Sequence, residues 1–363
     1  MPTTTTTGPV TPDIAGLQVD PGLLARGEEQ VALAGMARDV LSGSAGQGWA
    51  ELAALGLVGL LIPEEAGGSG GDARDLAVVM EAAGATLSDA PLLSGAFAVA
   101  VLAGLPDAAD LLPGIADGSL RATLALPQHS SVTLEGDRVT GSAGPVLDPD
   151  ADLVLLVATD TAGTPVLVCC AGDADGITRT GLTVLDPTRP LVRLDLTDVP
   201  ARILAREADL DPALAIGSIA LAAESVGITD HALRETVAYV TGRQQFGRPI
   251  GSFQAVKHRL ADLLVELEAA RSAVALAAAC AVGAPELLPV TAAAAQLTAG
   301  NAAALAVKEY VQLHGGIGFT WEHPAHRYVR RVRASAGLFG SAHEIRLQIA
   351  DLLGLPGGNS HVR

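Results

Sequence analysis

Two short segments in the C-terminal third of the chain carry the residues best suited to bind a ligand. One is the glycine-rich segment Gln312–Phe319, and the other is the upstream segment Arg243–Gln254. Glycine has no Cβ, so a backbone rich in it can approach a ligand closely. The upstream segment begins with an arginine, whose guanidinium forks onto phosphate oxygens, and carries a phenylalanine at Phe246. Together they are suited to a ligand with a phosphate group and a flat ring.

The elements that position these segments are predicted to be helices. From about Pro212 to Leu355 the pattern is helical, and four leucines follow the spacing i, i+3, i+4, i+7 of a helix packed in a bundle: Leu260, Leu263, Leu264 and Leu267. The Ala-rich run Ala292–Val307 is interrupted by polar residues and closed by Lys308 and Glu309. This run is therefore interpreted as a buried bundle helix rather than a membrane span.

The first third of the chain is also predicted to be helical, with a glycine-rich loop at 64–71. Between about 121 and 205, short β-branched runs bounded by Gly, Pro and Asp indicate strands, the clearest at 152–158, 165–170 and 191–195. The predicted fold is mainly α with an inserted small β domain. The expected boundaries are 1–19 for a disordered tail, 20–120 for an N-terminal helical domain, 121–205 for the β domain, 206–355 for a helical bundle and 356–363 for a second tail.

Composition narrows the class of protein. The chain has 363 residues, of which 49% are hydrophobic but only 3% aromatic, so its core must be built largely from Ala, Leu and Val. The formal net charge of −17 argues against a nucleic-acid partner. Three cysteines give neither a disulfide framework nor a metal-ligand spacing, and the N-terminus has no signal-peptide pattern. We expect a cytoplasmic protein without a membrane segment.

The two ligand-binding segments, in this order and separation, resemble the C-terminal domain of the acyl-CoA dehydrogenase family, FAD enzymes that desaturate acyl thioesters. The resemblance implies an N-terminal helical domain, a middle β-barrel domain and a C-terminal four-helix bundle. It also implies contacts to FAD, some of them to a cofactor held mainly by a dimer mate, from Arg243, Phe246, Gln254, Gln312, Gly315, Gly316, Ser341 and His343. Taken singly, each residue has a plain alternative: a surface ion pair, a core side chain or a helix cap.

The family's catalytic base is missing from its usual position. By resemblance that position is Phe339, and an alternative position used by some members falls at Gly217 or Ser218, so neither holds a carboxylate. The nearest candidate is Glu224 in an apolar helical run, since a buried glutamate with a raised pKa has the profile of a general base. A structural salt bridge is the alternative, and it is favoured.

Other parts of the chain also depart from the family. The segment Ala122–Ser131 replaces the family's flavin-covering sequence, and Gly144–Leu147 replaces the aromatic strand that packs on the flavin ring. Pro145 has no N–H, so it suits an edge or bend better than a central strand. A metal site at His323 and His326 is not expected, because Pro324 separates them and no ligand set accompanies them.

Three functions remain open. The favoured one is a subunit of a heteromeric acyl-CoA dehydrogenase, as the resemblance to short enzymes of bacterial steroid degradation implies, with a paralogous partner in an α2β2 assembly. The second is a homo-oligomeric dehydrogenase that acts on an acyl-CoA or acyl-carrier-protein thioester with Glu224 as base. The third is a non-catalytic thioester-binding or assembly protein. An electron-transfer flavoprotein is the acceptor that the resemblance implies.

Overall fold

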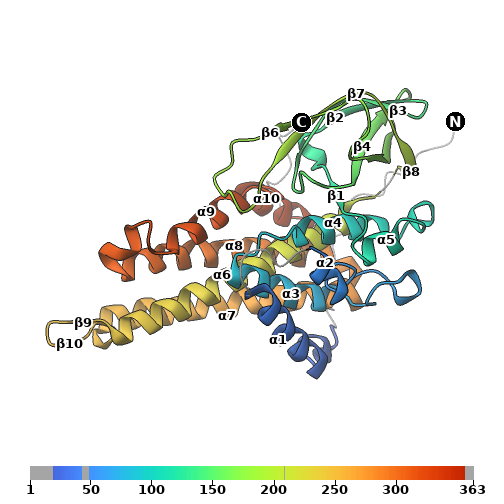
Figure 1. The fold of residues 1–363 in the computed structure, drawn as a ribbon. Helices are drawn as coiled ribbons and strands as arrows, with labels where there is room; N and C mark the ends of the chain where they lie inside the picture. Colours follow the sequence, from blue (N-terminus) through green and yellow to red (C-terminus); the bar gives the residue numbers. More distant parts are fainter. Residues whose placement is uncertain (1–18, 43–48, 208, 356–363) are drawn as a thin grey trace.

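The computed structural model describes residues 19–42, 49–207 and 209–355, and the two expected tails lie almost wholly outside these ranges. Two helical parts lie together, and a β domain sits against one side of them (Figure 1). This arrangement confirms the predicted fold class. The strands of the β domain fall between Ala122 and Arg206, and the chain on either side is helical apart from a two-stranded hairpin between Gln244 and Pro249.

Within the described residues the N-terminal part has five α-helices, of which α3 and α4 pack against the C-terminal bundle. They are α1 (Glu28–Ser42), α2 (Trp49–Ala54), α3 (Ala73–Thr86), α4 (Leu92–Leu102) and α5 (Leu112–Ala116). Asp72 and Asp75 form a capping box that fixes the start of α3. The glycine-rich loop precedes α3, as the sequence predicted.

The C-terminal part is organised around three long helices, α6 (Asp211–Gly242), α7 (Gln254–Gly283) and α8 (Leu288–Leu313). Helix α6 packs on α8, α7 and α3. At the α3–α6 crossing the backbones touch, because a Cβ added at Gly84 would lie 2.0 Å from the carbonyl oxygen of Glu224. Small residues allow this close approach, which explains how a core with few aromatic rings is tightly packed.

The leucine stripe on α7 is only partly buried. Leu263 and Leu267 have almost no exposed surface, whereas Leu264 is 48% exposed. The prediction that all four leucines pack inside the bundle is therefore wrong for Leu264. The apolar surface of α7 is broader than the core of one chain requires.

The β domain is an eight-stranded sheet in the order β6-β7-β3-β2-β4-β5-β8, with β1 paired to β4. Its strands are β1 (Ala122–Leu124), β2 (Ser131–Glu135), β3 (Arg138–Val146), β4 (Leu153–Asp160), β5 (Pro165–Ala171), β6 (Ile177–Gly181), β7 (Val192–Pro200) and β8 (Arg202–Arg206). In β4, Leu155 faces a core shared with the helices, whereas Val154 and Leu156 face the core inside the domain. Both faces are covered, so the strand is apolar without alternation. Pro145 lies at a register shift between β3 and β7, in keeping with its predicted bend position.

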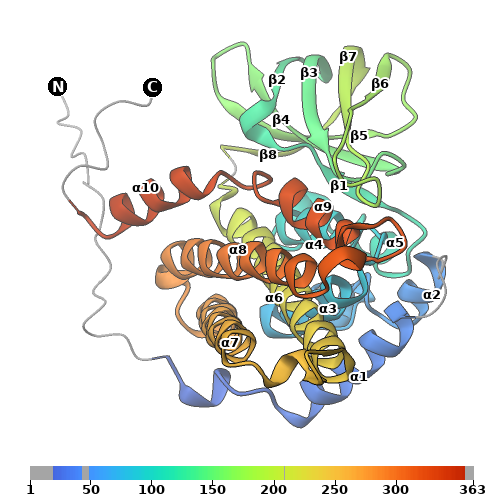
Figure 2. The same ribbon diagram turned by 90° about the vertical axis from the view of Figure 1, so that its left-hand side faces the viewer.

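The remaining elements connect the long helices or follow α8 in the chain. A short hairpin, β9 (Gln244–Gln245) and β10 (Arg248–Pro249), joins α6 to α7, and a 3-10 turn at Gly315–Phe319 follows α8. Helices α9 (Ala325–Ser335) and α10 (Ala342–Leu352) complete the described chain. Figure 2 looks along α7, with α8 lying across the view beside it and the β domain above the helices.

Two helices, Asp211–Gly242 and Pro285–Leu313, are long and apolar enough to cross a membrane by length and composition alone. They pack against each other, and most of the apolar window in each is buried inside the protein. Core helices of this kind pass the same test, so the two helices are assigned to the bundle.

Candidate functional site

The two ligand-binding segments meet at one end of the helical bundle, the end that points left in Figure 1. Tyr239, in the last turn of α6, stacks on His314, with ring centroids 4.3 Å apart. Arg243 follows one turn later, and its backbone N–H donates to the carbonyl of Tyr239 at 2.8 Å. His314 lies between Gln312 and Gly315. A buried stacking contact therefore joins segments that are some seventy positions apart in the sequence.

This end of the protein exposes both polar and apolar groups. Phe246 is 92% exposed, Phe319 89% and Trp321 73%. Arg243, Gln254 and Gln312 are exposed as well. An isolated chain does not gain by leaving large rings in water, so this surface has the composition of one that a ligand or partner covers.

The glycine segment offers open backbone. Gly315 has a left-handed φ of +62°, which side chains rarely adopt. A Cβ added at either Gly315 or Gly316 would have no other group within 4 Å. The glycines are not required by packing within this chain, so the space above them is free for a group from outside.

Ser341 and His343, the last two residues expected to contact FAD, lie at the start of α10. The Ser341 side chain accepts a hydrogen bond from the backbone N–H of Glu344, whose carboxylate accepts one from the N–H of Ser341 at 2.7 Å. Ser341 is therefore a helix cap, although its own O–H stays available as a donor. His343 is exposed on the first turn.

Beneath the glycine segment lies a cluster of histidine and tyrosine rings. Tyr310 contacts His231, His314 and His323 edge-on, and His231 stacks on Tyr328 at 4.4 Å. Burial lowers the pKa of each of the three histidines below the ordinary value of 6.5. The rings are therefore held neutral, and they support the backbone that carries Gln312 and Gly315.

The histidine cluster predicts that the protein loses stability in mild acid. The unfolded chain takes up protons as the pH falls through the ordinary histidine pKa of about 6.5, whereas the folded chain resists protonation. The free energy of unfolding should therefore be fully present above that pH and fall below it. Urea unfolding midpoints between about pH 8 and about pH 5.5 test this expectation. His314→Gln should flatten the pH dependence, and an unchanged profile would show that His314 does not contribute.

Phe339 occupies the position where the family carries its base. Its ring packs edge-on against Phe97 of α4, with centroids 5.3 Å apart. On the other side it covers Gly217 of α6, where an added Cβ would lie 3.2 Å from the Phe339 ring. Both sequence positions at which a base is found in the family thus meet here, and the contact between them is apolar.

The segment matched to the flavin-covering sequence also reaches this region. The side-chain amide of Gln128 donates to the carbonyl oxygen of Leu338 at 3.3 Å, which ties the β domain directly to the residue before Phe339. The hydroxyl of Ser130 accepts from the N–H of Gly144 at 3.3 Å. These polar groups bind one another within the chain.

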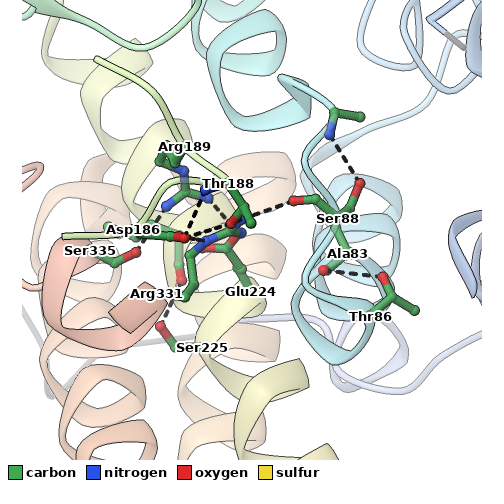
Figure 3. Close-up of polar contacts among 12 residues, drawn as sticks. Ala83, Thr86, Ser88, Asp186, Thr188, Arg189, Glu224, Ser225, Arg331 and Ser335 are labelled. Carbon is green, nitrogen blue, oxygen red and sulfur yellow. Dashed lines mark hydrogen bonds and ion pairs between the residues drawn. The ribbon is translucent and has the colours of Figure 1, made fainter. Parts of the chain in front are cut away.

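Glu224 belongs to a buried ion cluster that joins three parts of the protein (Figure 3). Arg331 of α9 donates to Glu224 at 2.6 Å and also pairs with Asp186. Arg189, from the same β-domain loop as Asp186, pairs with Glu224. Two carboxylates and two guanidiniums give the cluster no net charge. Additional hydrogen bonds run from Arg331 to the carbonyl of Ser88 at 3.0 Å and from Arg189 to a hydroxyl of α9.

Glu224 does not have the raised pKa that the general-base alternative requires. Burial raises the pKa of the carboxyl, but Arg189 and Arg331 outweigh that effect and hold the pKa below its ordinary value. Glu224 is 2% exposed. A carboxylate that is ion-paired with two arginines is a poor proton acceptor. The geometry agrees with the structural salt bridge that the sequence analysis favoured over a general base.

The sequence did not reveal the partners of Glu224. Arg331 follows Arg330 in a basic segment, which by composition alone would be placed in solvent. In the structure Arg331 is only 1% exposed, whereas Arg330 lies over the Trp321 ring. The signal was the helical spacing of α9, which places Arg331 on the same face as Tyr328 and Ser335. Its partner Asp186 lies in a loop whose position only the tertiary fold defines.

Comparisons with known proteins agree with this architecture. Residues 28–108 match the acyl-CoA dehydrogenase N-terminal domain, and residues 211–353 match the C-terminal domain. Acyl-CoA dehydrogenase IpdE2 of Mycobacterium tuberculosis is 39% identical over 80% of this chain and 81% of its own length. Acyl-CoA dehydrogenase FadE34 of the same organism is 36% identical over 81% of this chain but only 40% of its own length.

Two solved structures extend the comparison. A variant of the Tcur3481–Tcur3483 steroid ACAD is 33% identical, with a TM-score of 0.80, and the match covers 90% of this chain and 98% of that one. The ChsE4–ChsE5 complex of Mycobacterium tuberculosis has the same fold, with a TM-score of 0.82 at 24% identity over 91% of this chain and 98% of that one. On the domain matches and on the extent of the similarity, the chain belongs to the acyl-CoA dehydrogenase family.

Proposed function

We propose that this chain is one subunit of a heteromeric, FAD-dependent acyl-CoA dehydrogenase and that it supplies contacts to the ADP half of a cofactor held across the interface. The observation that carries the proposal is a contrast between two regions of the chain: the exposed end of the bundle and the region around Phe339. The two segments proposed to contact the ADP half are exposed together at one end of the bundle. The region of the base is instead filled by the apolar contact between Phe339, Phe97 and Gly217.

The exposed end fits the ADP half of FAD. Arg243 supplies a permanent charge for the pyrophosphate, Phe246 supplies an aromatic face for the adenine, and Gly315 leaves its backbone open. Gln254, Gln312 and Gly316 add polar groups and further open backbone at the same end. When bound, the cofactor would accept hydride from the acyl thioester.

The region expected to face the flavin ring lacks the hydrogen-bonding groups that such a ring would need. Pro145 and Leu147 offer no hydrogen bond from their side chains, and Pro145 has no N–H to donate. Gln128 is already bonded to the carbonyl of Leu338. Phe339 cannot take a proton. We derive no catalytic step for this chain and assign the base to the partner subunit.

Leu264 and the neighbouring Val265 are 48% and 67% exposed on α7, which supports an oligomeric assembly. A heteromer is favoured over a homomer because both structures reported above are named for two polypeptides. An electron-transfer flavoprotein as acceptor and a cytoplasmic location complete the proposal.

The absorbance spectrum tests the proposal most directly. The chain purified alone should be colourless or weakly yellow, because it holds only part of a cofactor site. Coexpressed with a paralogue that carries the glutamate, it should elute as one assembly with a flavin band. A yellow chain that is bleached anaerobically by an acyl-CoA on its own would contradict the proposal. A colourless protein with every paralogue would favour a non-catalytic assembly protein.

A further inference from the structure

A cavity lies beside the N-terminal helices, away from the end of the bundle that carries Arg243 and Gly315. Its volume is about 650 Å³, and it is formed by the short turn Pro21–Leu23 and by α1, α3, α6 and α7. Cavities that bind small molecules usually measure about 300–1,000 Å³. None of the residues expected to bind FAD lines it.

The charge of this cavity is opposite to that of the protein. Its charged lining consists of one glutamate, Glu81, and five arginines: Arg26, Arg38, Arg74, Arg234 and Arg271. The whole chain has a formal net charge of −17. Arg74 and Arg234 pair with neighbouring aspartates, and Arg271 pairs with Asp230 and Glu268, so part of this positive charge is compensated. A local excess of positive charge in a concave surface still attracts anions, even on a protein whose overall field repels them.

Two of the arginines face solvent at the cavity. Arg26 and Arg271 both pair with the buried Glu81. Arg234 pairs with Asp230 through Nε, and its side chain is 65% exposed. Among the described residues, Arg38 has no carboxylate within ion-pair distance and is exposed. These two side chains can therefore receive an anion.

The rest of the lining is apolar. Its accessible apolar surface comes from Leu24, which is 43% exposed, and from the half-buried Leu23, Ala275 and Leu276. The buried valines of α3, α6 and α7 lie behind this surface. A hydrated inorganic ion would gain little from such walls. An apolar body would cover the accessible part, at about 25 cal/mol for each Å² removed from water.

We propose that this cavity binds an amphipathic organic anion, an apolar body with a carboxylate or phosphate head, at a site separate from the cofactor. The head lies against Arg38 and Arg234, and the body lies along the leucines of the turn before α1 and along Ala275 and Leu276 of α7. The proposal does not depend on flavin binding or on the heteromer.

Isothermal titration calorimetry on the purified assembly tests the site, with sodium decanoate and decyl phosphate as probes below their aggregation limits. Decanoate should bind, and decyltrimethylammonium, which has the same chain but the opposite charge, should not. The relative affinities of decanoate and decyl phosphate identify the preferred head. Acetate should bind too weakly to measure, since it has no apolar body.

Variants locate the binding. Arg38→Gln together with Arg234→Gln should weaken decanoate binding roughly tenfold or more. Ala275→Trp, which places a large ring into the cavity, should abolish it. Arg179→Gln, on the exposed strand β6, removes the same charge elsewhere and should leave the affinity unchanged. Circular dichroism confirms that each variant is folded.

Three results would overturn the proposal: no heat of binding with either probe, equal affinity for the cationic chain, or unchanged affinity in the folded double-arginine variant. The flavin spectrum of the same samples is recorded in parallel. Loss of decanoate binding with normal flavin content separates this site from the cofactor site.

Discussion

Arg331→Met should destabilise the protein more than any other single change at the surface between its domains. The substitution keeps most of the side-chain volume but removes a charge that pairs with both Asp186 and Glu224. The buried cluster is then left with two carboxylates and one guanidinium. Breaking a buried ion pair from one side costs about 3–5 kcal/mol. The urea midpoint for unfolding should fall accordingly, and the contacts between the β domain and the bundle should open first.

Two further variants separate charge balance from packing. Arg331→Met combined with Asp186→Asn leaves the Arg189–Glu224 pair neutral, so it should recover part of the lost stability. Arg333→Met changes an exposed arginine on the same helix and should have little effect. If Arg331→Met and Arg333→Met have the same midpoint, the cluster does not stabilise the protein. Glu224→Gln should likewise reduce stability, and normal stability with lost flavin reduction would restore Glu224 as a base.

The fold was predictable because its signals are local. Helical apolar spacing, a glycine-rich loop and short β-branched runs each depend on neighbours within a few residues. Thus the strand predicted at 165–170 is β5 (Pro165–Ala171), and the Ala-rich run lies within α8. Leu264 was misassigned because helical spacing shows which residues share a face, but not whether this chain alone covers that face.

The two segments proposed to contact the cofactor were recognisable for a different reason: their residues lie within two short stretches of sequence. What brings the stretches together, the stacking of Tyr239 on His314, could not be read from spacing. The ion cluster around Glu224 was less accessible still, since its members come from α6, α9 and a β-domain loop. Burial raises the pKa of Glu224, and the charges of Arg189 and Arg331 lower it further than burial raises it. The tertiary fold alone brings these two arginines to the carboxylate.

Arg243→Ala should remove most of the FAD from the assembled heteromer while leaving the assembly intact. In the single chain Arg243 is exposed, and the adjoining rings Phe246 and Phe253 lie edge to face at 6.1 Å. A partner that covers this end would desolvate the guanidinium together with the pyrophosphate. Truncating one side of such a pair costs roughly 2–4 kcal/mol, a loss of about thirtyfold or more in affinity.

The ratio of flavin to protein absorbance after gel filtration measures the effect of Arg243→Ala. Arg243→Lys keeps the charge but not the forked pair of donors, so it should retain an intermediate amount of FAD. Arg193→Ala, on the exposed face of β7, is the matched control and should retain all of it. Full flavin content in a stable Arg243→Ala heteromer would exclude this arginine from the site. Loss of FAD together with dissociation of the subunits would instead place Arg243 in the protein interface, where its contribution to the cofactor is indirect.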